Sequence, residues 1–173
     1  LDRAYDFESG AFLPVLEVLK RSAPLSVLDV PHQWSDWTRS LLSEVDEIVI
    51  TAVPDLANLR NTKNMLDALK KLRPNDKPPH LVLNQVGMPK RPEIAPSDFF
   101  EPLELEPVAI IPFDVQMFGN AANSGRMIFE VDPKSAIAET FAQLSHVVTG
   151  RVAAKKPKRA GLGAMLSMLR KRK

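Results

Sequence analysis

Polar residues stand at the carboxyl-terminal ends of three short apolar runs in this sequence. Asp29 lies near the end of the run 25–30, Asn84 lies late in the run 80–86, and a third run leads directly into residues 112–114. In open α/β sheets, ligands bind at the carboxyl ends of the strands. We therefore expect Asp29, Asn84 and residues 112–114 to line one cleft.

The chemistry of these residues favours a nucleotide. A strand-terminal carboxylate such as Asp29 can hold Mg²⁺ through water beside a phosphate, and the Asn84 amide has the donors and acceptor that read a purine edge. Pro112, Phe113 and Asp114 form a loop in which the aromatic ring can cover a base. Each residue also has a plainer interpretation, because aspartates often cap turns and asparagines often bond locally.

A phosphate-binding loop is missing from the sequence. The P-loop pattern is Gly, four residues, then Gly-Lys-Ser/Thr. The nearest stretch has five residues between Gly119 and Gly125, followed by Arg126 and Met127 in place of the lysine and the hydroxyl residue. We therefore predict no catalytic residue, no ATP hydrolysis and no bound cofactor for this chain by itself.

The candidate residues must be positioned by a sheet. Four apolar runs without polar alternation, near residues 25–30, 47–53, 80–86 and 106–111, predict strands that are buried on both faces. Helical patterns separate these runs, which indicates parallel strands joined by crossover helices. The prediction is an α/β fold with a parallel sheet and helices on both faces, spanning residues 1–150.

Composition and charge narrow the class of protein. Of the 173 residues, 45% are apolar and 25% are charged, as in globular domains. No apolar run reaches the roughly 18 residues that suggest a membrane-spanning helix. The chain has no cysteine, so disulfides and thiolate chemistry are excluded. Residues 1–150 hold 14 Lys and Arg against 21 Asp and Glu, a net −7, which argues against nucleic acid as a partner of this part of the chain.

The C-terminal end has the opposite charge. Residues 151–173 hold nine Lys and Arg and no acid. We predict a basic linker over 151–159 and an amphipathic helix over 160–173. Its apolar stripe has helical spacing and its cations follow: Leu162, Met165, Leu166 and Leu169, then Arg170, Lys171, Arg172 and Lys173. Three interpretations stay open, namely a solvated end, an anchor on an anionic membrane surface, and an arm that binds nucleic acid or a partner.

The order of the motifs resembles a known superfamily. The motifs on which the resemblance rests are Leu28-Asp29-Val30-Pro31, Leu83-Asn84-Gln85-Val86, Ile111-Pro112-Phe113-Asp114, Gly125-Arg126 and Val131-Asp132-Pro133. Together, over about residues 11–150, they resemble the C-terminal two thirds of a deviant-Walker ATPase of the MinD/ParA type. The resemblance implies an incomplete P-loop NTPase-like fold for this chain. Within that superfamily the chain looks like the CpaE/TadZ branch, which assembles Flp/Tad pili.

The resemblance implies a function. It makes Asn84 the residue that contacts adenine, places residues 112–114 at the adenine, and places Asp29 in the nucleotide-sensing switch. It implies a homodimeric scaffold that positions the pilus secretion machinery, in the cytoplasm or peripherally on the inner membrane, with ATP and Mg²⁺ as ligands of a full-length protein. The alternatives are an active MinD-like ATPase that cycles on and off the membrane and a ParA-type DNA-partitioning ATPase.

Two departures from the family pattern qualify these expectations. Pro31 is followed by His32, Gln33 and Trp34, where MinD-like proteins commonly continue to a glycine that senses the γ-phosphate. The part of the family that carries the P-loop and a central strand has no counterpart in the sequence. We therefore expect an uncovered sheet edge, and a chain that is one part of a longer protein.

Overall fold

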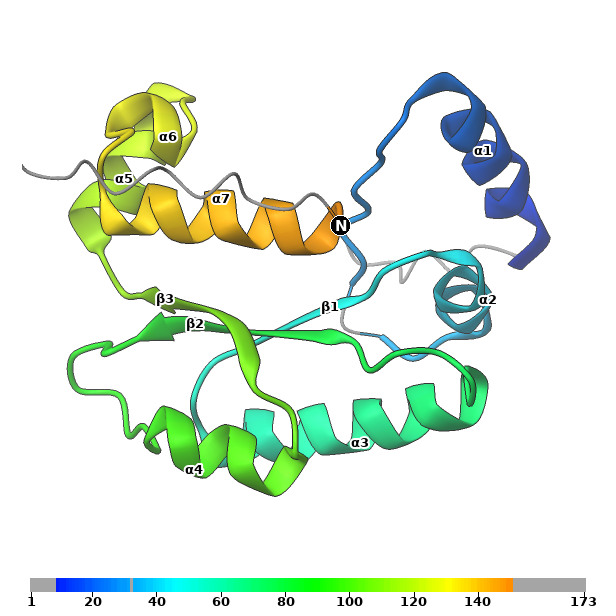
Figure 1. Ribbon diagram of the computed structural model, residues 1–173, viewed down its shortest axis with the longest axis horizontal. Coiled ribbons are helices and arrows are strands. Elements are labelled where there is room, and N and C mark those ends of the chain that lie inside the picture. Colours follow the sequence, from blue (N-terminus) through cyan, green and yellow to red (C-terminus); the bar gives the residue numbers. More distant parts are fainter. Residues whose placement is uncertain (1–8, 32, 151–173) are drawn as a thin grey trace, which may run out of the picture.

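The computed structural model describes residues 9–31 and 33–150, and it shows a parallel sheet with helices on both faces (Figure 1). The strands are β1 (Val49–Ala52), β2 (His80–Val86) and β3 (Pro107–Pro112), in the order β1-β2-β3. Both neighbouring pairs are parallel, with Ile50 opposite Leu81 and Leu83 opposite Ile110. The predicted α/β fold class is confirmed.

The central strand β2 explains why its apolar run has no polar alternation. Leu81 and Leu83 pack into one core cluster with Phe99, whereas Val82 packs into a second cluster with Ile111. All three β2 side chains are at most 2% exposed. The strand therefore buries both of its faces.

Helices cover the two faces of the sheet. On one face lie α3 (Leu56–Leu72), α4 (Pro96–Phe100) and the short 3₁₀ helix Glu101–Leu103, and on the other lies α7 (Ala136–Val148), as Figure 1 shows. Asp55 begins α3 because its carboxylate accepts a hydrogen bond from the Asn58 N–H at 2.7 Å. This bond lowers the pKa of Asp55 below its usual value. Ser135 caps α7 in the same way.

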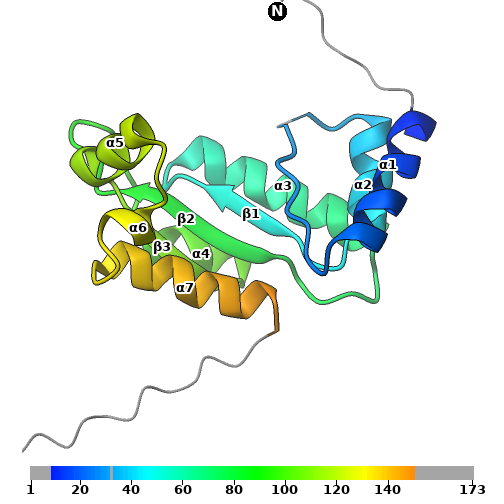
Figure 2. The same cartoon turned by 90° about the horizontal axis from the view of Figure 1, so that it is seen from above.

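The remaining helices lie at the two ends of the sheet. α5 (Val115–Ser124) and α6 (Ile128–Val131) follow β3 at the carboxyl end of the strands (Figure 2). At the opposite end, α1 (Ser9–Ser22) packs on α2 (Asp36–Glu44), where the Phe12 and Trp37 rings meet edge to face at 5.9 Å. None of the helices in the described ranges is long and apolar enough to cross a membrane.

The predicted strand over residues 25–30 is wrong. This segment has no strand structure, and Leu25 and Val27 are 55% and 85% exposed. A strand needs a neighbouring backbone to bond with, and in the described sheet β1 is an edge strand paired only to β2. Of the four predicted strands, three form in the described residues. Of these, β1 is shorter than its predicted range of 47–53. The predicted linker and tail helix, residues 151–173, lie outside the described residues.

Candidate functional site

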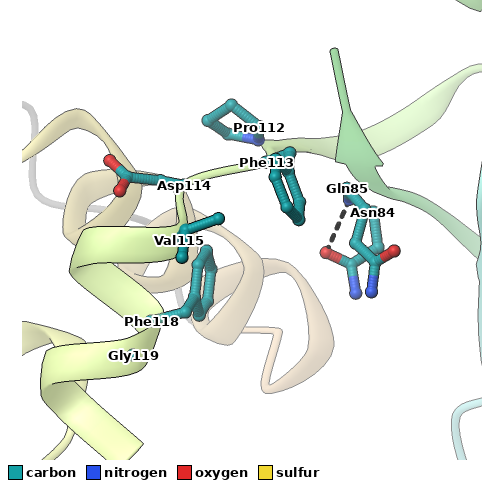
Figure 3. Close-up of a pocket in the computed structure, with 8 residues that line it drawn as sticks. All are labelled: Asn84, Gln85, Pro112, Phe113, Asp114, Val115, Phe118 and Gly119. Carbon is teal, nitrogen blue, oxygen red and sulfur yellow. Dashed lines mark hydrogen bonds between the residues drawn. The ribbon is translucent and has the colours of Figure 1, made fainter. Parts of the chain in front are cut away.

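A hollow of about 390 Å³ opens at the carboxyl end of β2 and β3 (Figure 3). It lies where the end of β2 faces the loop that leads from β3 into α5. Its lining consists of Asn84, Gln85, Pro112, Phe113, Asp114, Val115, Phe118 and Gly119. The structure thus brings Asn84 together with residues 112–114, which are far apart in the sequence.

The loop after β3 is held against β2 by the backbone. The Phe113 N–H donates to the Val86 carbonyl oxygen at 2.8 Å, which continues the β2–β3 pairing past the last strand residue. Phe113 is half-buried, and its ring points toward the Asn84 and Gln85 side chains (Figure 3). Phe118, from α5, packs against the core cluster that contains Val82. The hollow therefore has aromatic walls on a fixed backbone.

Two consecutive carboxamides form the opposite wall. Both side chains line the hollow, and in Figure 3 their carboxamides point the same way. The Asn84 Oδ1 accepts a hydrogen bond from the Gln85 N–H at 2.8 Å. Asn84 therefore makes the local hydrogen bond that the sequence analysis gave as its plainer role. This bond uses the side-chain oxygen and leaves the NH₂ group available as a donor to a ligand.

Asp114 acts on its own helix. Its Oδ1 accepts a hydrogen bond from the Met117 N–H at 2.8 Å, so Asp114 is the N-cap of α5. In Figure 3 its carboxylate points away from the space between Phe113 and Asn84. The capping bond positions α5, and with it Val115 and Phe118, along the hollow.

Asp29 lies elsewhere. It lines a second hollow, of about 360 Å³, together with Phe12, Leu28, Trp37 and Leu41. The expected single cleft therefore does not include Asp29, because the segment that carries it joins no strand of the described sheet. In the described parts of the chain, no group of three or more His, Asp or Glu side chains is arranged to hold a metal ion.

Sequence reasoning missed four of the lining residues. In a regular strand, Gln85 would face away from its neighbour Asn84, so nothing in the sequence placed both on one wall. Val115, Phe118 and Gly119 belong to the first turns of α5. An aspartate cap followed by apolar residues at positions 115 and 118 is the signal that could have located them.

The described residues fit a nucleotide base better than its phosphates. A flat base fits between aromatic rings and a carboxamide NH₂ group. In contrast, the stretch that came nearest to a P-loop is the helix α5, which ends at Gly125 in a left-handed C-cap with φ 63°. Backbone N–H groups inside a helix are bonded to the helix itself and cannot surround phosphates. In the described ranges the hollow thus has aromatic and amide groups along its walls and no phosphate cradle.

Known structures share this fold. Over 84% of this chain, the MinD cell division ATPase of Pyrococcus furiosus superposes with a TM-score of 0.68 at 21% identity. The MinD cell division protein of Aquifex aeolicus superposes over 85% of this chain with a TM-score of 0.67 at 17% sequence identity. A ParA family ATPase of Chlorobium tepidum superposes over 81% of this chain with a TM-score of 0.64 at 19% sequence identity. No protein-family model and no curated protein matches the sequence.

The chain therefore has the α/β fold found in MinD and ParA ATPases. It spans 60%, 63% and 56% of the Pyrococcus, Aquifex and Chlorobium chains, respectively. The structure of a MinC:MinD complex from Aquifex aeolicus matches in the same way, with a TM-score of 0.68.

Proposed function

We propose that this chain is the C-terminal part of a MinD/ParA-like positioning protein, and that its hollow between β2, β3 and α5 receives a purine base. The observation that carries the proposal is the position of that hollow. It lies at the carboxyl end of two parallel strands, where open α/β sheets bind their ligands.

The lining residues have distinct roles in this proposal. Phe113 and Phe118 provide the apolar surface on which a base stacks. The NH₂ group of Asn84 donates to a ring nitrogen of the base. Pro112 restricts the backbone before Phe113, and Asp114 holds α5 against the hollow.

The phosphates and the metal belong to a longer protein. The chain spans about 56–63% of the MinD and ParA structures that share its fold, and we infer that the remaining part of such a protein supplies a phosphate loop beside the edge strand β1. ATP and Mg²⁺ are then the ligands of that longer protein, and Asp29, which lines the second hollow, is not assigned to their site. This chain by itself does not hydrolyse ATP.

The proposed cellular role is that of the CpaE/TadZ type. In this role a homodimer positions the Flp/Tad pilus secretion machinery, in the cytoplasm and peripherally on the inner membrane. The support is the sequence resemblance together with the fold. A MinD-like ATPase that cycles on and off the membrane is the alternative, and a phosphate loop with its lysines upstream of Leu1 would favour it. The net charge of −7 over residues 1–150 disfavours a ParA-type DNA-partitioning role.

The basic tail is proposed as a membrane anchor. The stripe of Leu162, Met165, Leu166 and Leu169 inserts at the bilayer surface, while the cations over 170–173 contact anionic headgroups. Each basic residue near such a surface contributes about 1 kcal/mol. One tail therefore binds weakly, and two tails on a dimer bind more tightly through effective concentration.

Titration of the chain with AMP tests the base pocket separately from the phosphate loop, without which we expect no ATP–Mg²⁺ cofactor to be held. Phe113→Ala removes base stacking, worth about 1–3 kcal/mol, so affinity falls roughly 5- to 150-fold. Asn84→Ala removes a hydrogen bond worth about 0.5–1.5 kcal/mol, so affinity falls roughly 2- to 12-fold. The matched control Asn64→Ala, on the exposed surface of α3, leaves affinity unchanged. Absence of AMP binding, or equal losses in all three variants, contradicts the proposal.

A further inference from the structure

The loop that follows β2 folds back onto the end of that strand through two charged side chains. The Glu93 carboxylate accepts hydrogen bonds from the Gly87 N–H at 2.9 Å and the Met88 N–H at 3.0 Å. It also accepts from the Arg91 guanidinium, at 2.6 Å from Nη2 and 3.2 Å from Nε. Both side chains are less than one-fifth exposed. Glu93 therefore fixes the orientation of Arg91.

Arg91 in turn holds Gln85. Its Nη1 donates to Gln85 Oε1 at 3.1 Å, and its Nη2 donates to the Gln85 carbonyl oxygen. One guanidinium thus binds both the side chain and the backbone of a residue six positions away. The loop is also tied to the turn that follows the neighbouring strand β1, because the Ile94 N–H donates to the Pro54 carbonyl oxygen at 2.9 Å.

The residue held in this way has an unusual backbone. Gln85 has φ 56°, in the left-handed region that L-residues disfavour. The β2–β3 register is also irregular between Leu83 and Val86. Successive side chains of a regular strand face opposite sides. The left-handed residue breaks this alternation, and this is why Asn84 and Gln85 point the same way (Figure 3).

The same contacts orient both carboxamides. Arg91 occupies the Gln85 side-chain oxygen, and the Gln85 N–H occupies the Asn84 side-chain oxygen. With the two oxygens bonded, each side chain has its NH₂ group left as a donor, and both side chains line the hollow (Figure 3). The two NH₂ groups are hydrogen-bond donors, the counterpart of acceptor atoms on a ligand.

We propose that Arg91, oriented by Glu93, is a positioning residue for the base pocket: it holds Gln85 in the left-handed conformation that presents the Asn84 and Gln85 carboxamides together. This inference rests on the proposed function. Neither Arg91 nor Glu93 lines the hollow, so their effect on binding passes through Gln85. An ion pair that served stability alone would have no influence on which way Asn84 and Gln85 point.

The first experiment measures the backbone of Gln85 without any ligand. The three-bond HN–Hα coupling and Cα shift of Gln85 report φ by NMR. We expect a positive φ in the unmodified chain and a shift to negative φ in Arg91→Ala and Arg91→Lys, since lysine lacks the planar fork that binds two oxygens. The control Arg60→Ala, at an exposed position of α3, leaves φ unchanged. An unchanged φ in both Arg91 variants overturns the proposal.

The second experiment measures AMP affinity and includes a rescue. Arg91→Ala lowers affinity about 5- to 30-fold, which corresponds to the usual preference of L-residues against the left-handed region. Glycine adopts this region freely. In a Gln85→Gly background the same Arg91→Ala change therefore lowers affinity by less than about twofold. An equal loss in both backgrounds overturns the positioning role.

The two proposals fail in different ways. If the unmodified chain does not bind AMP, the proposed function is wrong, and the ligand-free φ of Gln85 alone decides whether Arg91 positions the carboxamides. If the chain binds AMP but Arg91→Ala binds equally well, the base pocket stands and the positioning role is refuted.

Discussion

Substitution of Asp114 separates a helix cap from a ligand-binding carboxylate. Asp114 lines the hollow, yet its Oδ1 accepts the Met117 N–H at 2.8 Å and begins α5. Asparagine caps helices about as well as aspartate, whereas alanine cannot. We therefore compare Asp114→Ala with Asp114→Asn.

The expected effects follow from the capping bond. Loss of an N-cap side chain lowers the free energy of unfolding by about 0.5–2 kcal/mol, and 1 kcal/mol corresponds to about 2–4 °C in Tm for a domain of roughly this size. Asp114→Asn keeps the bond and loses only the interaction of the charge with the helix N-terminus, about 0.3–1 kcal/mol. Asp114→Ala should therefore be the less stable of the two.

Thermal and urea unfolding followed by circular dichroism measure these differences. Asp46→Ala is the control, because Asp46 is exposed and outside the helices. If Asp114→Asn destabilises the chain as much as Asp114→Ala, the capping argument is refuted. If Asp114→Ala abolishes AMP binding with unchanged stability, Asp114 is a ligand contact instead.

Three further predictions concern the core, the acidic groups and the tail. Phe99→Ala empties a fully buried position and lowers the urea-derived free energy of unfolding by about 3–5 kcal/mol. Folding lowers the pKa of Asp55 and of Glu93, mainly through N–H groups of Asn58 and Gly87, so their ionised forms stabilise the fold above the ordinary values of 3.8 and 4.5. Stability should fall as pH decreases below these values, and less so in Asp55→Asn and Glu93→Gln. The intact chain should co-sediment with anionic liposomes more than a chain ending at Gly150, with a difference that shrinks in high salt; equal sedimentation refutes the anchor.

The sequence predicted the sheet best where burial alone decides the structure. The run 80–86 is apolar without alternation, and β2 packs its side chains into both core clusters. Asp55, a residue type that favours the N-cap position, caps the helix that begins at Leu56. These features depend on residues close together in the chain and on the pattern of apolar side chains, and both can be seen in a single sequence.

Features that depend on distant partners were not predictable in this way. The run 25–30 has strand composition, but no described strand is placed to pair with it. The left-handed backbone of Gln85 depends on Arg91 and Glu93, whose side chains reach back from the following loop. A run of residue types does not record such contacts, and the pairing of Asn84 with Gln85 became visible only in three dimensions.

Mapping AMP onto the chain by NMR tests the central claim most directly. We predict that AMP shifts the backbone amide signals of Asn84 and Gln85 and of residues 113–119, and that it leaves the second hollow around Asp29 unaffected. Shifts confined to the second hollow, or no shifts at saturating AMP, would contradict a purine site at the carboxyl end of β2 and β3.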